Sequence, residues 1–317
     1  MRKVSGVLCC GNAVFDVLVR AVDELRWNTT CWVEQIRHTM GGNGSNTAYA
    51  LAVLGARVRL LAWVGSDPAG QTLLARLAAA GVDLTAVRRS QLPTATSVSL
   101  INRRGDRFLL HSPGASLEAF AGPPELTGEM LAGMTHFHLA NLFAAPNLRR
   151  HGAEWLRCAR AAGLITSLDT GWDQDGRWML DLGPALPWVD LLFVNEEETL
   201  GLTGTADLEQ AARVLAERGC REVVFKLGPR GCAVWSAGRL YSVPAFDVAA
   251  TDTTGAGDCF AGAFLAATLR GLSRWEAARF ANAAAALAVQ QVGATEGLRS
   301  WEETEAWMQT ARVRTHP

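Results

Sequence analysis

The sequence lacks any long hydrophobic run, and no stretch approaches the roughly 18 consecutive apolar residues that a membrane-spanning helix requires. The apolar run at residues 7–10 is too short for the core of a signal peptide and leads into Gly11 and Asn12, so we expect a first strand. The sequence also has no excess of either charge sign, because 30 basic and 31 acidic residues give a net charge of −1. Binding to nucleic acid or membranes through bulk electrostatics is therefore not expected.

Metal-binding and disulfide patterns are absent as well. The seven cysteines are odd in number, form no C-x-x-C pair and lie mostly within apolar runs. Buried thiols of a cytoplasmic protein are expected, and a disulfide framework or a zinc site is not. The six histidines show no metal-ligand spacing, and no G-x-S-x-G elbow is present, so zinc-enzyme and hydrolase functions have no support.

Short apolar runs alternate with stretches of helical periodicity along most of the chain. The expected strands are residues 7–10, 59–64, 136–140, 164–168, 190–194 and 223–227. The expected helices include residues 47–54, 70–80, 148–162 and 208–218, and several end on glycine. This alternation predicts a doubly wound α/β fold whose mostly parallel sheet is covered on both faces. One domain over residues 1–317 accommodates the whole pattern.

Two segments interrupt the alternation. Residues 15–40 show little helical periodicity, and residues 94–111 have the pattern of a β-hairpin with its turn at residues 103–106. We expect both segments to form a small β-sheet that acts as a lid, although a surface decoration would leave the same pattern. An exposed edge of this lid would pair between subunits, so a homodimer through the lid is expected.

The most informative motif is D-T-T-G-A-G-D at residues 252–258, which opens a helical stretch over residues 259–269. Backbone N–H groups around Gly255, Ala256 and Gly257 are expected to form an anion hole for a phosphoryl group. Asp258 would lie in the first helical turn and take the proton of an attacking hydroxyl. A helix N-terminus should make it a weak base, but positioning matters more than basicity in phosphoryl transfer. A capped helix with a flexible entry explains a bare G-x-G-D equally well.

A second motif, G-G-N-G-S-N at residues 41–46, precedes another expected helix. Gly42 allows close approach of the backbone to a ligand, and Asn46 offers both a donor and an acceptor to hydroxyl groups. A loop with a helix N-cap is the alternative. Two more expected strands are followed by short motifs. One is N-E-E-E, with Asn195 and Glu198, which an ordinary helix start would also explain. The other is K-L-G-P-R-G, with Lys226, which a simple turn would also explain.

Together these motifs, in this order, resemble the signatures of the ribokinase-like (PfkB) sugar kinases, and the resemblance extends from about Val7 to Gly297. It implies ATP-dependent phosphorylation with Asp258 as catalytic base, and ATP and Mg²⁺ as cofactors. Asp169 and Trp172, which follow another expected strand, would add a carboxylate and an indole to the pocket, although a packed tryptophan is the commoner outcome.

The resemblance also assigns further residues to ligands. The residues expected to hold the sugar are Asp16, Gly42, Asn43, Asn46 and Asn141, together with Asp169. Those expected at the nucleotide are Asn195, Lys226, Gly228, Gly231, Gly257 and Asn282. Glu198 would lie near Mg²⁺, through water. A monovalent cation such as K⁺ would be held by Asp252 and Thr254 with backbone oxygens near Ala288, Gln291, Gly293 and Gly297.

The expected reaction is transfer of the γ-phosphoryl group of ATP to a hydroxyl of a pentose or ketohexose. Two departures weaken a strict ribose assignment, because Asn43 replaces a lysine of ribokinases and Asn141 replaces an acidic residue. A nucleoside kinase of the same fold is the alternative among enzymes. A non-catalytic regulatory protein that binds sugar or nucleotide is the alternative of a different class, against which the intact Asp258 and N-x-x-E argue.

Overall fold

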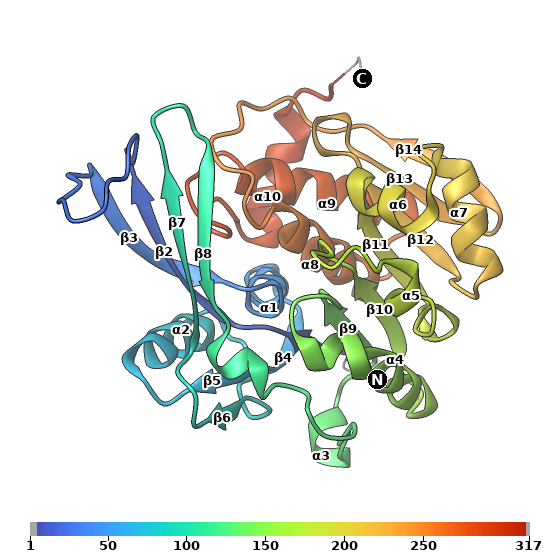
Figure 1. Ribbon diagram of the computed structural model, residues 1–317. Helices are drawn as coiled ribbons and strands as arrows, with labels where there is room; N and C mark the ends of the chain where they lie inside the picture. The colour runs from blue at the N-terminus through green and yellow to red at the C-terminus, as the bar shows by residue number, and fades with distance from the viewer. Residues whose placement is uncertain (1–4, 315–317) are drawn as a thin grey trace.

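The centre of the molecule is an eight-stranded sheet, seen in a computed structural model that describes residues 5–314 (Figure 1). Its strand order is β14-β13-β12-β11-β10-β9-β1-β4. The bounds are β1 (Gly6–Gly11), β4 (Arg57–Leu61), β9 (His136–Ala140), β10 (Ile165–Asp169), β11 (Leu191–Asn195), β12 (Glu222–Lys226), β13 (Cys232–Ser236) and β14 (Arg239–Val243). Neighbours from β4 to β12 are parallel, and only β13 and β14 join antiparallel. The predicted fold class, a mostly parallel doubly wound sheet, is confirmed.

Both faces of this sheet are buried, as the continuous apolar strands predict. In β1, Val7 and Cys9 pack into one hydrophobic cluster, whereas Leu8 and Cys10 pack into another on the opposite face. The first cluster contains residues of α1 (Asn43–Val53), α8 (Ala256–Leu269) and α9 (Arg274–Ala288). The second contains residues of α4 (Pro146–Ala161) and α7 (Leu208–Glu217). The remaining longer helices are α2 (Pro68–Ala79), α6 (Glu196–Thr203) and α10 (Trp301–Thr310).

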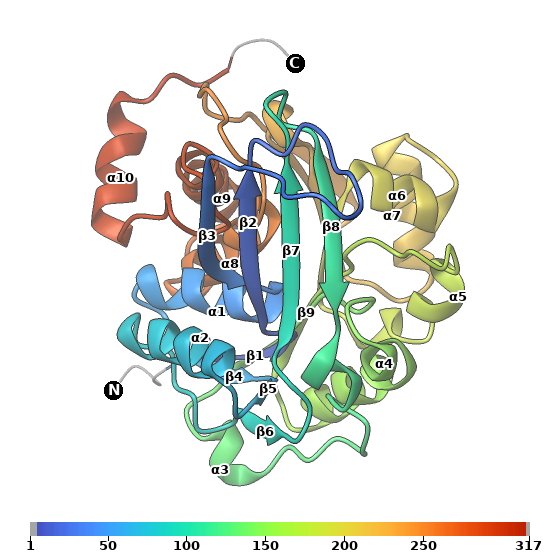
Figure 2. The ribbon, with the colours of Figure 1, turned by 60° about the vertical axis from the view of Figure 1, so that its left-hand side comes forward.

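A second sheet of four strands stands apart from the first (Figure 2). Its order is β3 (Gln35–Gly41), β2 (Val14–Arg20), β7 (Ala95–Ile101) and β8 (Arg107–Ser112). These strands come from the two segments that interrupt the alternation, and β7 pairs with β8 as the predicted hairpin, with Ile101 opposite Arg107. We call this sheet the lid.

Several predicted boundaries differ from the structure. The run at residues 59–64 divides into β4 and β5 (Trp63–Gly65), and β5 pairs with β6 (Arg88–Ser90) in a separate two-stranded sheet. Two helices begin earlier than predicted, since α1 starts at Asn43 and α8 at Ala256. As a result, the last residues of both glycine-rich motifs, 43–46 and 256–258, lie in the first turns of helices.

All seven cysteines are free, and five of them are buried. Cys31 and Cys158 depart from the expected burial, because they lie on the lid connection and on an exposed part of α4. None of the helices within residues 5–314 combines the length and the apolar character needed to cross a bilayer.

Candidate active site

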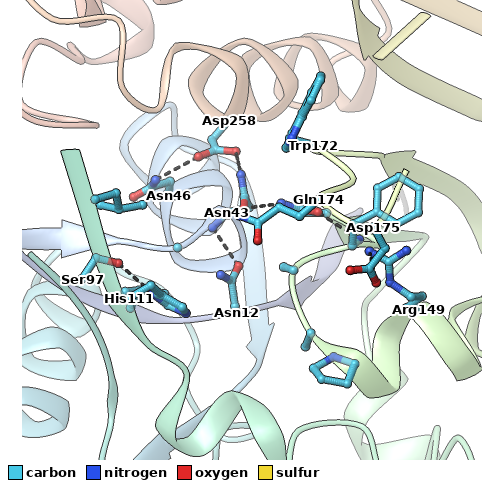
Figure 3. A pocket seen from close by; sticks show the side chains of 18 of the residues that line it. Asn12, Asn43, Asn46, Ser97, His111, Arg149, Trp172, Gln174, Asp175 and Asp258 are labelled. Atoms are coloured by element: carbon cyan, nitrogen blue, oxygen red, sulfur yellow. Dashed lines mark hydrogen bonds and ion pairs between the residues drawn. The ribbon is translucent and has the colours of Figure 1, made fainter. Parts of the chain in front are cut away.

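Asp258 lies in the first turn of α8, where it is buried with 6% exposure and faces the N-terminus of α1. Asn43 Nδ2 donates to its Oδ1 at 2.8 Å, and Asn46 Nδ2 donates to its Oδ2 at 2.9 Å (Figure 3). The two helices can approach this closely because Gly262 has no side chain, and a Cβ there would lie 2.8 Å from the Cβ of Ala50. The carboxylate is therefore fixed by two amides from a helix more than 200 residues away in sequence.

Burial raises the pKa of Asp258 to about 6, with the negative charge of Asp169 adding to the effect. The hydrogen bonds from Asn46 and Asn43 and the charge of Lys226 act in the opposite direction, since they favour the ionised form. The expectation of a weak base at the helix N-terminus was wrong, because desolvation outweighs the helix dipole at this buried position. A carboxylate with this pKa is mostly ionised at neutral pH and can still accept a proton.

The loop before α8 has the geometry of an anion site. Gly255 is the N-cap residue with φ +70°, and a Cβ there would clash with Ala294 at 2.5 Å. The N–H groups of the first helical turn have no acceptors within the helix and carry the positive end of its dipole. Ala256 N donates to Thr253 O at 3.3 Å, which leaves the following N–H groups of the turn for an anion.

A cavity of about 960 Å³ opens on one side of this loop, and we call it the acceptor cavity. Its wall includes Asn12, Asp16, Gly42, Asn43, Asn46, Ser97, His111, Asn141, Trp172, Thr254, Gly255 and Asp258. Five of the six residues predicted to hold the sugar are in this list. The lid contributes Asp16 from β2, Ser97 from β7 and His111 from β8.

Burial raises the pKa of Asp16 to about 6, and a hydrogen bond with Ser97 partly offsets this rise. The backbone at Gly41 passes so near that a Cβ there would lie 2.0 Å from Asp16 Oδ2. The first glycine of G-G-N-G-S-N therefore makes room for the carboxylate, a role that the motif alone did not reveal.

Asparagine side chains form a connected chain across the floor of the acceptor cavity. Asn141 Nδ2 donates to Asn43 Oδ1 at 2.8 Å, and Asn12 Oδ1 accepts from Asn43 N at 2.9 Å. Gly171 is required here, because a Cβ would lie 2.2 Å from the Asn141 amide. Position 43 thus links the Asp258 carboxylate to Asn141 through a single amide.

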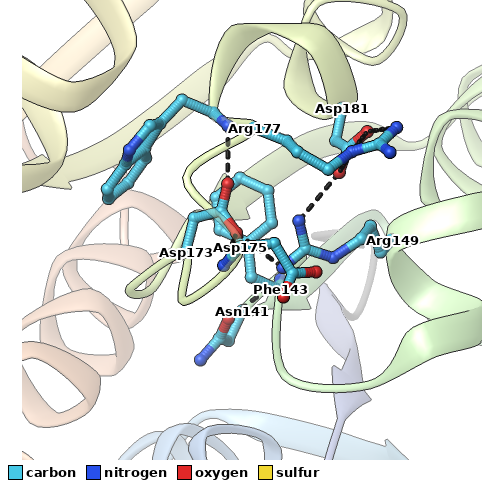
Figure 4. Close-up of polar contacts among 8 residues, drawn as sticks. Asn141, Phe143, Arg149, Asp173, Asp175, Arg177 and Asp181 are labelled. Carbon is cyan, nitrogen blue, oxygen red and sulfur yellow. Dashed lines mark hydrogen bonds and ion pairs between the residues drawn. The ribbon is translucent and has the colours of Figure 1, made fainter.

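The far wall of the acceptor cavity is a charged network around Arg149 (Figure 4). Its guanidinium donates to Asp173 at 2.7 Å and to Asp181 at 2.8 Å, and lies 4.8 Å from the centre of the Phe143 ring. Asp173 also accepts from the backbone N–H of Trp178 at 2.5 Å. These contacts hold the loop that presents Trp172, whose indole is 54% exposed.

A second cavity, of about 490 Å³, lies on the other side of the same loop, and we call it the donor cavity. All six residues predicted at the nucleotide line it: Asn195, Lys226, Gly228, Gly231, Gly257 and Asn282. Apolar side chains form another part of its wall, among them Phe246, Val248 and Val289. Asn282 is held in place, because its Nδ2 donates to Val243 O at 3.0 Å and Pro244 O at 3.1 Å.

Lys226 stands between the donor cavity and the first turn of α8. It is the only lysine of the chain besides Lys3, and its Nζ lies 3.3 Å from the position of a Cβ on Gly257. Asp169 Oδ2 accepts from Lys226 Nζ at 2.6 Å. The structure therefore pairs Asp169 with the donor-side lysine, and Asp169 is not in the wall of the acceptor cavity where the sequence predicted it.

Asn195 and Glu198 form a capping box at the start of α6. Asn195 Oδ1 accepts from Glu198 N, and Glu198 Oε2 accepts from Asn195 N, both at 2.8 Å, and from Thr170 Oγ1 at 3.1 Å. Burial raises the pKa of Glu198. Residues 5–314 contain no cluster of three acidic, histidine or cysteine ligands, so Glu198 fits Mg²⁺ only with waters and phosphate oxygens as further ligands, which is how proteins commonly bind this ion.

The predicted monovalent-cation residues lie together behind the loop. Gly293 N donates to Asp252 Oδ2 at 3.0 Å, and Thr254 N donates to Asp252 Oδ1 at 2.8 Å. A Cβ on Gly297 would lie 2.8 Å from the Ala288 carbonyl oxygen, to which Gln291 N donates at 3.4 Å. Arg107 of the lid also reaches Asp252 and Thr254, a contact that the sequence did not predict.

Asn12 directly follows β1, where ligands bind beyond the carboxyl ends of parallel strands, and the sequence pointed to it on that ground without giving it a role. Three other residues of the site were missed. Ser97, Arg107 and His111 alternate along the lid strands with outward-facing residues, but their inward direction depends on how the lid folds over the main sheet. No local motif marks them.

The segment over residues 253–258, which ends in the first turn of α8, separates the two cavities and lines both. Thr254, Gly255 and Asp258 face the acceptor cavity, whereas Thr253, Ala256 and Gly257 face the donor cavity. An anion-binding helix start with a basic carboxylate between two cavities is the architecture of an enzyme that transfers a phosphoryl group from one bound ligand to another.

Comparison with known proteins agrees with this class. The chain belongs to the PfkB family of carbohydrate kinases, whose profile matches residues 5–301. An ATP-dependent ribose-1-phosphate kinase from Halopiger xanaduensis is 33% identical over 91% of this chain and 93% of its own length.

Two solved structures share the fold. Arabidopsis thaliana ribokinase, in complex with ribose and ATP, is 27% identical with a TM-score of 0.83, covering 96% of this chain and 98% of that protein. A ribokinase II candidate from E. coli, solved with ATP and Mg²⁺, is 25% identical with a TM-score of 0.84 and covers 96% and 99%. The predicted enzyme class is confirmed: the protein is an ATP-dependent carbohydrate kinase.

Proposed function

We propose that this kinase phosphorylates a hydroxyl of a pentose bound in the acceptor cavity, with Asp258 as the base. The observation that carries the proposal is the placement of Asp258 in the first turn of α8, on the segment shared by the two cavities, with a pKa of about 6. A base in that position is mostly ionised at neutral pH and lies next to the N–H groups that would bind the transferred phosphoryl group.

In this reaction the sugar hydroxyl oxygen forms a bond to the γ-phosphorus of ATP while the bond from that phosphorus to the β–γ bridging oxygen breaks. The hydroxyl proton passes to a carboxylate oxygen of Asp258, and ADP leaves. The N–H groups at the start of α8 and the ammonium of Lys226 stabilise the negative charge on the transferred group. Mg²⁺, near Glu198, would neutralise charge on the phosphates.

The acceptor is proposed to be ribose or a ribose derivative. Asp16, Asn43 and Asn46 offer oxygens and amides to neutral hydroxyls, and the relatives named above act on ribose 1-phosphate or bind ribose. The guanidinium groups of Arg149 and Arg177 are paired with Asp173 and Asp181, whereas Arg150, exposed in the same wall, has no ion pair among residues 5–314. Because two of these three positive charges are neutralised, we expect an uncharged pentose to be preferred.

A nucleoside is the second candidate acceptor. The exposed indole of Trp172 in the wall of the acceptor cavity would stack on a base, and a volume of about 960 Å³ leaves room beyond a pentose. A Trp172→Ala variant distinguishes the nucleoside from the pentose as acceptor. The change should weaken nucleoside binding, because stacking is lost, and should leave ribose binding nearly unchanged.

The proposal is tested by a substrate panel of ribose, ribose 1-phosphate, fructose, 2-dehydro-3-deoxygluconate and adenosine. ADP release and ³¹P NMR of the product are followed with each acceptor. We expect the highest kcat/KM with ribose and a phosphomonoester as product. A higher kcat/KM with adenosine would establish the nucleoside alternative, and a lack of turnover with the whole panel would contradict the proposed function.

We further propose a homodimer through the lid, with both copies using the sheet face that points away from the acceptor cavity. Strand pairing puts the apolar side chains of Val17, Val19, Ile36, Val98, Leu100, Phe108 and Leu110 on that face. Ile36 and Phe108 are 61% and 63% exposed, an unusual exposure for a contiguous apolar row.

Sedimentation velocity tests this dimer. Phe108→Asp should convert the protein to a monomer, whereas Leu200→Asp, at an apolar residue of α6 that is 51% exposed, should leave it a dimer. A monomeric wild type, or a Phe108→Asp dimer, would refute the proposal.

The main sheet and the lid segments at residues 15–40 and 94–111 are proposed to act as one domain over residues 1–317. A cytoplasmic location is proposed from the free thiols. Potassium at Asp252 and Thr254 remains a prediction from the sequence, and its site would have to share both residues with Arg107.

A further inference from the structure

Arg107 connects the lid to the loop that precedes the catalytic helix. It is the first residue of β8, and its guanidinium donates to Asp252 Oδ1 at 2.5 Å and to Thr254 Oγ1. These partners lie 145 and 147 residues later in the chain, and Thr254 immediately precedes the N-cap Gly255 of α8. One lid side chain therefore contacts the segment that shapes the anion site.

The contact occupies the groups that a monovalent cation would need. Asp252 is buried at 4% exposure, and its two oxygens accept from Arg107, the N–H of Thr254 and the N–H of Gly293. The guanidinium supplies a positive charge beside this buried carboxyl group, and its fork engages the carboxyl group and the Thr254 hydroxyl together.

One backbone oxygen of the predicted cation site, and the one next to it in the chain, also have other partners. The carbonyl of Ala288 accepts from Gln291 N, and that of the neighbouring Val289 accepts from Thr251 N at 2.7 Å and Asp252 N at 3.1 Å. The residues at this position therefore do not fit a bound monovalent cation while Arg107 is in place.

We infer that Arg107 takes the place of the monovalent cation. It acts as a positioning residue, because from the lid it fixes the position of the loop that precedes α8. Leu109 and His111 lie on the same face of β8 as Arg107, because side chains two residues apart share a face. Both line the acceptor cavity. A sugar that contacts this strand therefore also fixes Arg107, which links acceptor binding to the order of the anion site.

Two consequences distinguish this arrangement from a cation site. The wild-type enzyme is indifferent to K⁺, since the charge at Asp252 is already balanced. Removal of the guanidinium leaves a buried carboxylate, a hydroxyl and nearby carbonyl oxygens, which is a set of hard oxygen ligands, so the variant should acquire a response to K⁺.

The test compares wild type, Arg107→Ala and Arg104→Ala in choline, sodium and potassium chloride at equal ionic strength. Arg104 is the matched control, because it is on the same hairpin and pairs with Asp106 in an exposed position. Two readouts are taken: the midpoint of thermal unfolding, and kcat with ATP and the acceptor favoured by the panel. The kcat readout rests on the proposed function, whereas thermal unfolding does not.

We expect wild type and Arg104→Ala to show the same Tm and kcat in all three salts. Arg107→Ala should lose about tenfold in kcat in choline chloride, the loss typical of one charge-assisted hydrogen-bonding partner. Potassium should restore most of this loss and raise the Tm of this variant alone. A purely structural role of Arg107 would lower the Tm equally in every salt.

Activation or stabilisation of the wild type by K⁺ would overturn the inference, as would an Arg107→Ala variant that does not respond to K⁺ in either readout. If no acceptor of the panel is phosphorylated, the proposed function fails, and the Tm series still decides the role of Arg107.

Discussion

The Asn46 amide donates to Asp258 Oδ2 at 2.9 Å, and together with the hydrogen bond from Asn43 it joins the two glycine-rich motifs of the chain. Asn46 Oδ1 is buried and finds no hydrogen-bond partner among residues 5–314. A sugar hydroxyl that donates a hydrogen bond to this oxygen would supply the missing partner. Asn46 thus binds the Asp258 carboxylate through Nδ2, and its Oδ1 is available to the acceptor.

The first prediction concerns pH. Asp258 must be ionised to accept a proton, so kcat/KM should be constant above neutral pH and fall as the pH drops through about 6. Burial also raises the pKa of Asp16 to about 6, so both groups contribute to the acid limb in the wild type. The profile is therefore measured in Asp16→Asn as well, where the remaining acid limb belongs to Asp258. An activity that is unchanged down to about pH 4, the ordinary range of a carboxyl group, would contradict this assignment.

The second prediction assigns Asp16 to the acceptor. Losing a buried hydrogen-bonding partner costs about 1–3 kcal/mol, so Asp16→Ala should raise the sugar KM about 10- to 100-fold. ATP affinity by calorimetry should stay nearly constant, because Asp16 is outside the donor cavity. Asp106→Ala, an exposed charge removal on the lid, is the control and should change neither constant. A parallel loss of ATP affinity in Asp16→Ala would place this residue elsewhere in the mechanism.

The third prediction concerns the buried pair of Lys226 and Asp169. Lys226→Met leaves Asp169 without its partner, and breaking such a pair costs about 3–5 kcal/mol of folding free energy. The double variant Lys226→Met/Asp169→Asn should regain much of this stability in chemical denaturation. It should not regain ATP affinity, because the ammonium near Gly257 is still missing. Recovery of both properties would show that Lys226 acts only in folding.

The fourth prediction follows from the raised pKa of Asp258. An acid with a folded-state pKa of about 6, against an ordinary value of 3.8, disfavours folding once the unfolded chain ionises. The cost is absent below the ordinary value and grows as the pH rises, reaching about 3 kcal/mol above pH 6. Asp258→Asn removes it, so the variant should be more stable than wild type at pH 8 and no more stable near pH 3.5. Thermal unfolding at both values measures the difference, and a destabilised variant at pH 8 would contradict the account.

Much of the site was predictable because it is encoded in short segments after strands. Five of the six predicted donor-cavity residues, and Asp258, lie at or just after the ends of β11 and β12 or at the start of α8, near the edge where the parallel strands end. The sixth, Asn282, lies within α9 and was assigned only through the resemblance. The partner of Asp169 was not predictable, because a position at that edge does not specify which neighbour a side chain contacts. The pKa of Asp258 was also missed, since its burial depends on the contact between α1 and α8. Arg107 was beyond prediction for the same reason, as its contact requires the lid to fold over the main sheet.

Steady-state kinetics of Asp258→Asn tests the central claim most directly. The amide retains the size of the carboxylate but cannot accept the proton, and a flip of the Asn46 amide would preserve one hydrogen bond through its free oxygen. We predict a fall in kcat of about 10²- to 10⁴-fold, with sugar and ATP binding retained in ligand-induced thermal shifts of the same preparation. A variant that binds both ligands and turns over the preferred acceptor at a near-native rate would show that Asp258 is not the base.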